Sequence, residues 1–318
     1  MRVHHIWITG SEAALIGFAP PLEDDESFEG YQSRVAGLFD RRAKFAHCYQ
    51  ANRAGLPSRI NSTLNNLSDS PSFDADDIVD DNSLFPLTAA FLDPQEAQSL
   101  RDFMLHGNRF PGRLYLGVHR RRFCAQCVSD DESRLGFAYW RNIHLSPLVF
   151  VCPIHEEQLI EWTGREDGPP SVLSSRTIPA ISDWLLQTAL LCRVSQLAKW
   201  ILENKPAPIP GGIKTLGQRM KILLAGAGFS VPDALPRKVE RCGGVKTRGL
   251  KRLSRCLLNC YGADELLLLG VVTADNQRLV EGPASILALT AYLNIEPGDL
   301  FGASCRLAST RIAPSTAA

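Results

Sequence analysis

The sequence lacks several features that would assign it to a familiar class of protein. No run of 18 apolar residues occurs, and the strongest apolar segment, residues 266–272, is far too short to span a bilayer. Net charge is also absent, because 34 basic residues balance 34 acidic ones. This balance argues against a surface coated in positive potential, so any nucleic-acid binding must depend on a local basic patch.

The signatures of common enzymes are missing as well. The sequence contains no GxSxG nucleophile motif and no P-loop, and Gly226-Ala-Gly228 lacks the third glycine of a dinucleotide fingerprint. Five aspartates gather in residues 74–81, but the stretch has no EF-hand glycine or terminal glutamate, which favours a solvated surface over a divalent-metal site. We therefore expect a protein that is not an enzyme.

Neither a full disulfide framework nor a secretory signal is indicated. The nine cysteines are odd in number, and the apolar run of residues 1–21 is interrupted by Gly10, Ser11 and Glu12. We expect this stretch to belong to the mature protein and the chain to occupy a reducing compartment. There, closely spaced thiols are more often metal ligands or small buried side chains.

Helical periodicity predominates, which predicts a mainly α-helical protein. Ser27 is placed to cap the first helix, and Asp93 with Pro94 marks the start of the second. Residues 57–83, rich in Ser, Asn, Asp and Pro, predict a loop or weakly ordered connector. The expected helices cover residues 28–42, 93–106, 181–203 and 213–225.

Two breaks rich in glycine and proline divide the chain, at residues 163–180 and 205–212. The sequence therefore predicts three units. The first covers residues 1–165, the second is a helical domain over 166–235, and the third covers 236–318.

A set of metal-ligand side chains stands in the first unit. Cys124 and Cys127 form a CxxC pair, and Cys152 and His155 form a CxxH pair after 24 intervening residues. Two tight pairs let four ligands converge on one ion, as in structural zinc sites. Three thiolates and an imidazole close the tetrahedron, so we expect a structural Zn²⁺ that stabilises the fold and leaves no open position for catalysis.

Other assignments of these residues were weighed. His144 and His119 are competing ligands, although residues 140–144 (WRNIH) are better interpreted as packing over the site. Two buried thiols beside an unrelated surface histidine are a further alternative. The pattern favours a zinc-ribbon-like insertion over residues 124–155, with short strands only at the knuckles.

A basic segment opens the third unit. Eight basic residues and one acid, Glu240, stand between Arg237 and Arg255. This density suits contact with DNA phosphates, and a solvated helix face with acidic neighbours is the alternative. The expected phosphate contacts are Lys246, Arg248, Lys251, Arg252 and Arg255.

The residues that follow are similar to the helix-turn-helix of phage-repressor-like domains. A short helix over 264–269, a glycine turn, a second helix from Thr273 to about Gly282 and a third over 285–293 give this succession. In such domains the second helix enters the major groove. An ordinary helical bundle is the alternative. The expected base-reading side chains are Asn276, Gln277 and Arg278.

Three further cysteines lie in or close after the basic segment, within residues 242–260. Cys256 and Cys260 have helical i, i+4 spacing, and Cys242 precedes them. No partner pair stands near them in the sequence, so buried thiols are favoured over a second zinc site.

Several motifs accompany the four zinc ligands. They are Phe123-Cys-Ala-Gln-Cys127, Asp130-Asp131, Tyr139-Trp140-Arg141 and Cys152-Pro-Ile-His155 followed by Leu159. Together they resemble the zinc-binding core of the TniQ/TnsD family of transposition target-selection proteins. Upstream, residues 21–27 (PLEDDES) and 34–36 (RVA) resemble the N-terminal element of that family, so the resemblance covers about residues 15–165.

The sequence departs from the family pattern at a few positions. Asp25 replaces a glycine, the residues after Ser27 are not the usual Ser-Trp-Leu, Ala125 replaces the knuckle proline, and His144 stands where tryptophan is common. None of these departures touches a zinc ligand.

The resemblance implies a non-enzymatic adaptor in the bacterial cytoplasm. Such a protein recognises a target site, directly on DNA or through the RNA-guided effector of a CRISPR-associated transposon. It recruits an AAA+ ATPase regulator, which positions the transposase, and a homodimer is compatible with this role. A stand-alone zinc-containing helix-turn-helix transcription regulator is the alternative function.

Overall fold

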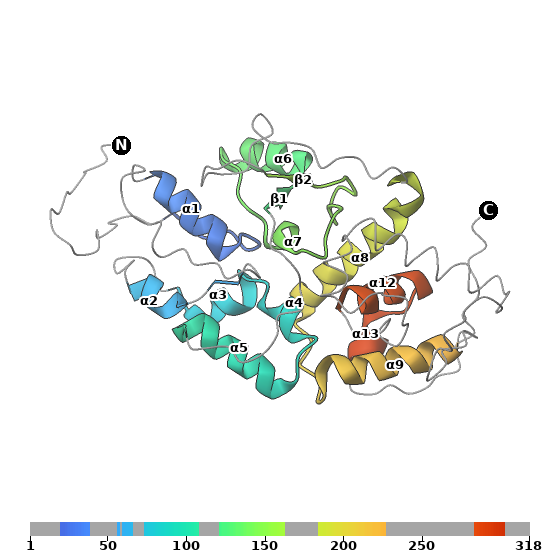
Figure 1. Ribbon diagram of the computed structural model, residues 1–318. Helices are drawn as coiled ribbons and strands as arrows, with labels where there is room; N and C mark the ends of the chain where they lie inside the picture. Colours follow the sequence, from blue (N-terminus) through green and yellow to red (C-terminus); the bar gives the residue numbers. More distant parts are fainter. Residues whose placement is uncertain are drawn as a thin grey trace.

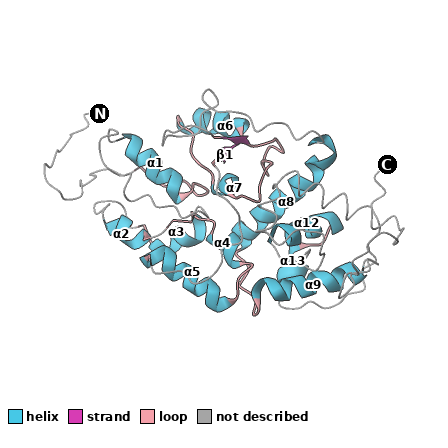
Figure 2. Ribbon diagram, in the orientation of Figure 1, coloured by secondary structure: helices cyan, strands magenta, loops and turns pink. Residues whose placement is uncertain are grey.

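The computed structural model describes residues 20–38, 56–57, 59–65, 73–107, 121–162, 184–226 and 283–302. The described part is mainly helical, as the sequence predicts (Figure 2). Its elements are α1 (Phe28–Leu38), α2 (Ile60–Asn65), α3 (Ala75–Asp81), α4 (Phe85–Ala89), α5 (Pro94–His106), β1 (Arg122–Phe123), α6 (Ala125–Leu135), α7 (Asn142–Leu145), β2 (Ile160–Glu161), α8 (Trp184–Asn204), α9 (Gly212–Gly226), α12 (Pro283–Leu293) and α13 (Pro297–Phe301).

The predicted helices are confirmed where the structure describes them. The predicted helix 28–42 corresponds to α1, whose last described residue is Leu38, and Ser27 accepts the Gly30 N–H at 2.9 Å as its cap. Helices α5, α8 and α9 each match a predicted helix to within a few residues.

Helix α5 shows why its boundaries were legible in the sequence. Asp93 accepts the Gln95 N–H at 2.9 Å, and Glu96 accepts the Asp93 N–H at 3.3 Å, which completes a capping box. Pro94 takes the first helical position, and Gly107 ends the helix with φ 76°. Backbone hydrogen bonds to the carboxylate also lower the pKa of Asp93.

The prediction of a loop over residues 57–83 was wrong at two places, because α2 and α3 lie within it. Asp74 caps α3 by accepting the Asp76 N–H at 2.9 Å, while Ile78 and Val79 are buried. The acidic composition suggested a solvated loop, but these side chains line the outer face of a short helix.

Basic partners pair with the acids of α3. Arg101 on α5 contacts both oxygens of Asp80 at 2.7 Å and Asp76 at 3.0 Å, and Lys205 contacts Asp81. The aspartates therefore attach α3 to its neighbours, which explains why an acid-rich segment forms a helix at this position.

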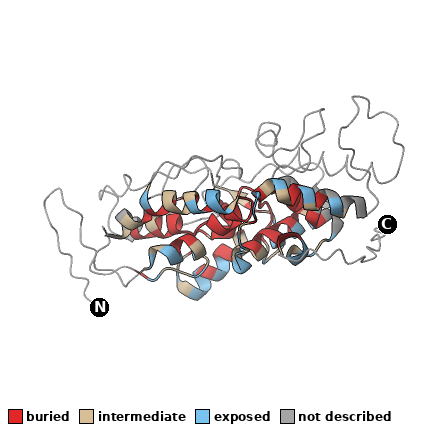
Figure 3. Ribbon diagram, turned by 90° about the horizontal axis from the view of Figure 1, so that it is seen from below, coloured by how far each residue is buried: buried red, intermediate tan, exposed pale blue. Residues whose placement is uncertain are grey.

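Helices α2, α3 and α5 group at one end of the molecule, and α8, α9, α12 and α13 at the other (Figure 1). Helix α8 packs against α4 and α12, so it links the two groups. Its buried positions include Leu191, Val194, Ala198 and Ile201. Buried residues gather along the middle of the molecule, between helices with exposed outer faces (Figure 3).

An aromatic contact crosses between these groups. Phe301 of α13 meets Phe91 edge to face at 5.8 Å and stacks on Trp200 of α8 at 6.3 Å between ring centroids. The division into units 1–165, 166–235 and 236–318 stays a prediction. In the described part, the hydrophobic core is continuous from α1 to α13.

The two strands flank the cysteine-histidine segment, as predicted. Strands β1 and β2 pair antiparallel, with Arg122 opposite Glu161 and Phe123 opposite Ile160. A further bridge joins Val151 to Gln158. The chain therefore enters and leaves the metal-ligand segment at one short ribbon.

Part of the third unit is also described. Helix α12 corresponds to the predicted third helix over 285–293. The basic segment, the predicted helices 264–269 and 273–282, and Cys242, Cys256 and Cys260 lie outside the described residues. Within the described part of the chain, no helix is long and apolar enough to cross a membrane.

Gly212 at the start of α9 approaches another backbone closely. Its φ is 52°, and an added Cβ would lie 2.7 Å from the Asp93 nitrogen and 2.8 Å from the Leu92 carbonyl carbon. A side chain here would meet both a left-handed conformation and a rigid neighbour.

We predict that Gly212→Ala lowers the free energy of unfolding by about 1–3 kcal/mol or more, because backbone strain and steric overlap add. Urea unfolding followed by circular dichroism would measure the change. Gly136→Ala is the matched control, since Gly136 has φ 79° but nothing within 4 Å of its added Cβ. Equal losses in the two variants would contradict the close-approach argument.

Candidate metal centre

Four predicted ligand side chains converge at one point between β1, α6 and the turn after Val151. The His155 Nδ1 lies 3.5 Å from the Cys124 Sγ, 3.3 Å from the Cys127 Sγ and 3.7 Å from the Cys152 Sγ. Cys127 and Cys152 are 3.7 Å apart between sulfurs, and all four ligand atoms lie within 4.8 Å of one another. The residues that the sequence singled out are thus brought together.

These separations suit a tetrahedral ion. Ligand atoms placed about 2.0–2.3 Å from one zinc lie about 3.3–3.8 Å from each other. A disulfide requires sulfurs about 2.05 Å apart, which the three free thiols do not approach. The cluster can therefore hold a metal ion, and its three sulfurs and one nitrogen form a donor set that structural zinc prefers.

Local structure aims each pair of ligands. Cys124 is the residue before α6 and Cys127 lies in its first turn, so the helix start sets their spacing. In the second pair, the Cys152 Sγ accepts the N–H groups of Ile154 and His155, both at 3.4 Å. Glu156 then turns the chain with φ 56°.

The charge states of the thiols also favour a cation. Hydrogen bonds from the Cys124 and Cys127 side chains, with the two backbone N–H groups, lower the pKa of Cys152 and favour its thiolate. Hydrogen bonds of the Cys127 thiol with Cys124 and Cys152 raise its pKa, and burial and repulsion between close thiolates act in the same direction. A divalent ion between the sulfurs removes this conflict.

A buried arginine connects the two knuckles. Arg122 of β1 donates to the Val149 carbonyl at 2.9 Å and lies 4.2 Å above the Phe150 ring. Its position just before Cys124 fixes the strand that leads to the first pair against the segment that leads to the second. The basic residues before the first knuckle therefore serve the fold, at least at this position.

His144 stands apart from the four-ligand cluster, as the packing interpretation expected. It lies in α7 with 1% exposure, and its Nε2 has no hydrogen-bond partner among the described residues. Burial lowers the pKa of His144 to about 4, so the ring is neutral. The nearby Trp140 packs edge to face on Phe123 at 6.2 Å and on Trp162 at 6.0 Å. His119 lies outside the described residues.

A network of ion pairs joins the N-terminal element to α6. Arg141 contacts Asp25 and, at 2.6 Å, the buried Asp131 of α6. The Tyr139 hydroxyl donates to Asp25 at 2.6 Å. The sequence marked Asp25 only as a departure from the family pattern, and its role as the shared acceptor was missed.

Backbone hydrogen bonds run beside this network. The Ser27 N–H donates to the Trp140 carbonyl, and the Asn142 N–H donates to the Asp25 carbonyl, both at 2.8 Å. Residues 25–27 and 140–142 therefore run side by side, although more than 110 positions separate them in the chain.

A second buried pair holds the N-terminal element against α1. Glu26 is fully buried and accepts two hydrogen bonds from Arg34, at 2.9 and 2.5 Å. Arg34 also donates to the Pro21 carbonyl at 2.7 Å, and Asn82 donates to the Glu26 carbonyl at 2.8 Å. Burial raises the pKa of Glu26 and the Arg34 guanidinium opposes that rise, so removing Arg34 would leave an uncompensated buried acid.

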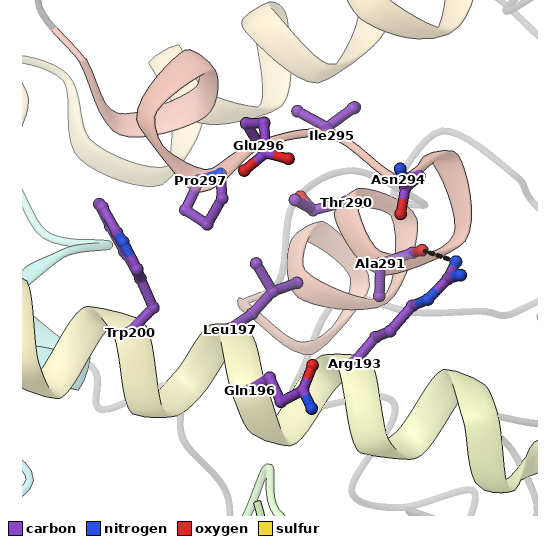
Figure 4. Close-up of a pocket in the computed structure, with 10 residues that line it drawn as sticks. All are labelled: Arg193, Gln196, Leu197, Trp200, Thr290, Ala291, Asn294, Ile295, Glu296 and Pro297. Atoms are coloured by element: carbon purple, nitrogen blue, oxygen red, sulfur yellow. Dashed lines mark hydrogen bonds between the residues drawn. The ribbon is translucent and has the colours of Figure 1, made fainter. Parts of the chain in front are cut away.

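A groove of about 290 Å³ lies away from the metal centre, between α8 and the α12–α13 junction (Figure 4). Arg193 and Trp200 line it from α8, and Thr290, Ala291 and residues 294–297 line the other side. Arg193 donates to the Ala291 carbonyl at 3.3 Å, and the Thr290 hydroxyl donates within its own helix. Its ten lining residues include no cysteine or histidine, so they provide no second soft-metal site.

The eight residues predicted to contact DNA, from Lys246 to Arg278, all lie outside the described residues. Their grouping on one surface therefore stays a prediction.

We predict that Cys152→Ser removes the bound metal and unfolds the N-terminal half. Structural zinc contributes about 10–16 kcal/mol to small domains, which equals or exceeds the whole stability of a typical protein. Metal content by mass spectrometry and thermal melting would measure both effects. Cys192→Ala removes a buried thiol outside the cluster and should keep the metal. A Cys152→Ser protein with full metal content and an unchanged melting temperature would refute the prediction.

We also predict a pH-dependent stability term from His144. Because its folded pKa lies near 4, below the ordinary 6.5, the unfolded chain binds the proton more readily between these values. Stability is therefore lost as pH falls from 6.5 toward 4, by about 1 kcal/mol between pH 7.5 and 5.5. In urea unfolding, wild type should lose that much more than His144→Leu over this interval. Equal losses of stability in the two proteins would contradict the lowered pKa of His144. Acid releases the metal from both proteins, so the difference between them reports on His144 alone.

Comparison with known proteins places these features in a family. Residues 18–159 match the TniQ family, and the match ends four positions after His155. A stretch of 109 residues is 27% identical to the transposon Tn7 transposition protein TnsD of Escherichia coli, covering 32% of this chain and 22% of that protein. The chain therefore aligns with less than a quarter of its relative's length. Residues 18–159 are thus a TniQ domain, which makes up less than half of the chain.

Proposed function

We propose that this chain is a non-enzymatic target-site selector for DNA transposition. It links target DNA, or an RNA-guided effector complex bound to DNA, to an AAA+ ATPase regulator and its transposase. The TniQ match over residues 18–159 supports this role, as does the similarity to TnsD, which is named as a transposition protein.

The observation that carries the proposal is that charged residues of the TniQ motifs form ion pairs within the fold. Arg141 pairs with Asp131 and also with Asp25, which departs from the family pattern, and Glu26 pairs with Arg34. Ion pairs of this kind occupy the charged groups of the motifs and hold the segments together. A domain so organised is suited to presenting a surface to other macromolecules.

In this proposal a structural Zn²⁺ binds Cys124, Cys127, Cys152 and His155. The ion supplies folding free energy and closes its own coordination sphere. Helix α6 then connects the ion to the N-terminal element. It carries the ligand Cys127 and, one turn later, Asp131, which pairs with Arg141.

DNA contact belongs to the third unit in this proposal. The basic side chains Lys246, Arg248, Lys251, Arg252 and Arg255 would bind phosphates. Asn276, Gln277 and Arg278 would read base edges.

We predict that alanine at Lys251, Arg252 and Arg255 together weakens binding to duplex DNA and flattens its salt dependence. Each lost phosphate contact should reduce the slope of log K against log salt by about 0.9. Fluorescence anisotropy at several salt concentrations would measure the slope. Lys214→Ala, on the exposed part of α9, is the control. An unchanged slope in the triple variant would show that the basic segment faces something other than DNA.

The proposed function is tested by binding and recruitment with the zinc-loaded protein. Purified chain is mixed with a library of genomic fragments, and with a purified AAA+ ATPase regulator of transposition. Retention of the ATPase supports the proposal, and enrichment of one fragment would add direct target reading. Weak, uniform DNA binding with ATPase retention would assign target choice to a guide complex. Tight binding of one operator without ATPase retention would contradict the proposal and favour the transcription-regulator alternative.

A further inference from the structure

His155 divides its two ring nitrogens between two neighbours. Its Nδ1 lies 3.3–3.7 Å from the three ligand sulfurs, on the side where an ion would sit. Its Nε2 faces the opposite way and lies 3.1 Å from the Asp130 Oδ2. A metal-bound histidine is a neutral imidazole with one N–H. If Nδ1 holds the ion, Nε2 carries the hydrogen, and Asp130 is placed to accept it.

Asp130 is itself held in place. Gln126 donates through Nε2 to the Asp130 Oδ1 at 2.8 Å, so each carboxylate oxygen has its own partner. Both residues belong to α6, four positions apart, and therefore lie on one face of the helix. Gln126 is also the residue before the ligand Cys127. One helix turn thus supplies a ligand, a carboxylate and the amide that orients it.

The two adjacent acids of α6, Asp130 and Asp131, contact different parts of the protein. Asp131 is buried and pairs with Arg141 at 2.6 Å, toward the N-terminal element. Asp130 has a side chain 52% exposed and faces His155. Successive helix positions lie about 100° apart around the axis, which places their side chains on different faces.

We propose that Asp130 is a positioning residue for the metal: it accepts the His155 Nε2–H, fixes the tautomer that presents Nδ1 to the ion, and is oriented by Gln126. The proposal rests on the metal assignment made above, and Asp130 itself does not touch the ion. The proposal explains how the most exposed ligand is held, because the His155 side chain is 22% exposed whereas the three cysteines are buried. A ring on a surface turn otherwise has freedom to rotate, and this hydrogen bond restricts it.

The expected loss of zinc affinity can be judged from carboxylates that accept the N–H of metal-bound histidines in other proteins. Their loss typically lowers metal affinity by 10–100-fold. Because the carboxylate of Asp130 is half exposed, we expect the lower end, about 10-fold. Gln126→Ala should cause a smaller loss, since it loosens the carboxylate without removing it.

The test compares full-length Asp130→Ala with Glu132→Ala. Glu132 is an exposed acid on the same helix, so the control changes charge and helix composition equally. Zinc affinity is measured by competition with a chromophoric chelator at pH 7.5. Long-range ¹H–¹⁵N NMR of the imidazoles reports which nitrogen of His155 carries hydrogen. Asp130→Glu, which retains a carboxylate, should recover part of the affinity.

We expect Asp130→Ala to bind zinc about 10-fold more weakly than wild type, with Glu132→Ala unchanged. The wild-type spectrum should show a protonated Nε2 and a metal-bound Nδ1. Equal affinities of the two alanine variants, or a metal-bound Nε2, would overturn the positioning role and leave the metal site intact. If wild-type protein bound no zinc at all, the metal assignment would fail together with this proposal. Neither result would bear on ATPase recruitment, which tests the proposed function separately.

Discussion

The convergence of three thiols and one imidazole on a single point is the constraint on which the N-terminal half depends. Cys124 and Cys127 come from the start of α6, and Cys152 and His155 come from a turn 25 to 31 residues farther along the chain. Close thiolates repel one another, so the arrangement is favourable only with a cation among them. The short β1–β2 ribbon is too small to supply this organisation by itself. In the proposed zinc-bound state, the ion thus substitutes for a larger core in this segment.

Helix α6 connects the cysteine-histidine cluster to the N-terminal element. Cys127 faces the metal, while Asp131, one turn later, binds Arg141, and Arg141 also contacts Asp25. The antiparallel pairing of residues 25–27 with 140–142 adds backbone hydrogen bonds to the same interface. A buried ion pair contributes to stability only while its two charged groups stay in contact, because a separated pair leaves an uncompensated buried charge. The cysteine-histidine cluster, α6 and the N-terminal element are therefore expected to order together.

The sequence predicted what depends on local spacing. The CxxC and CxxH pairs and the helix start at Asp93 and Pro94 need only a few neighbouring residues, and the structure forms them. The network around Asp25 could not be predicted from the residues, because Arg141 lies 116 positions away and the pairing arises only from packing. Residues 57–83 were misassigned for a related reason: their aspartates looked like solvated loop residues until Arg101 and Lys205 were placed beside them. The contact between His155 and Asp130 could not be predicted either, because CxxH spacing does not tell which ring nitrogen faces the ion.

The central claim is that the metal centre holds the N-terminal element in place through α6. Hydrogen exchange of the zinc-loaded chain, before and after a strong chelator removes the metal, tests it most directly. The account predicts that residues 20–38 and 121–162 lose protection together, while the packed pair α8 and α12 keeps most of its protection. Loss of protection confined to residues 121–162, with 20–38 unchanged, would contradict the account.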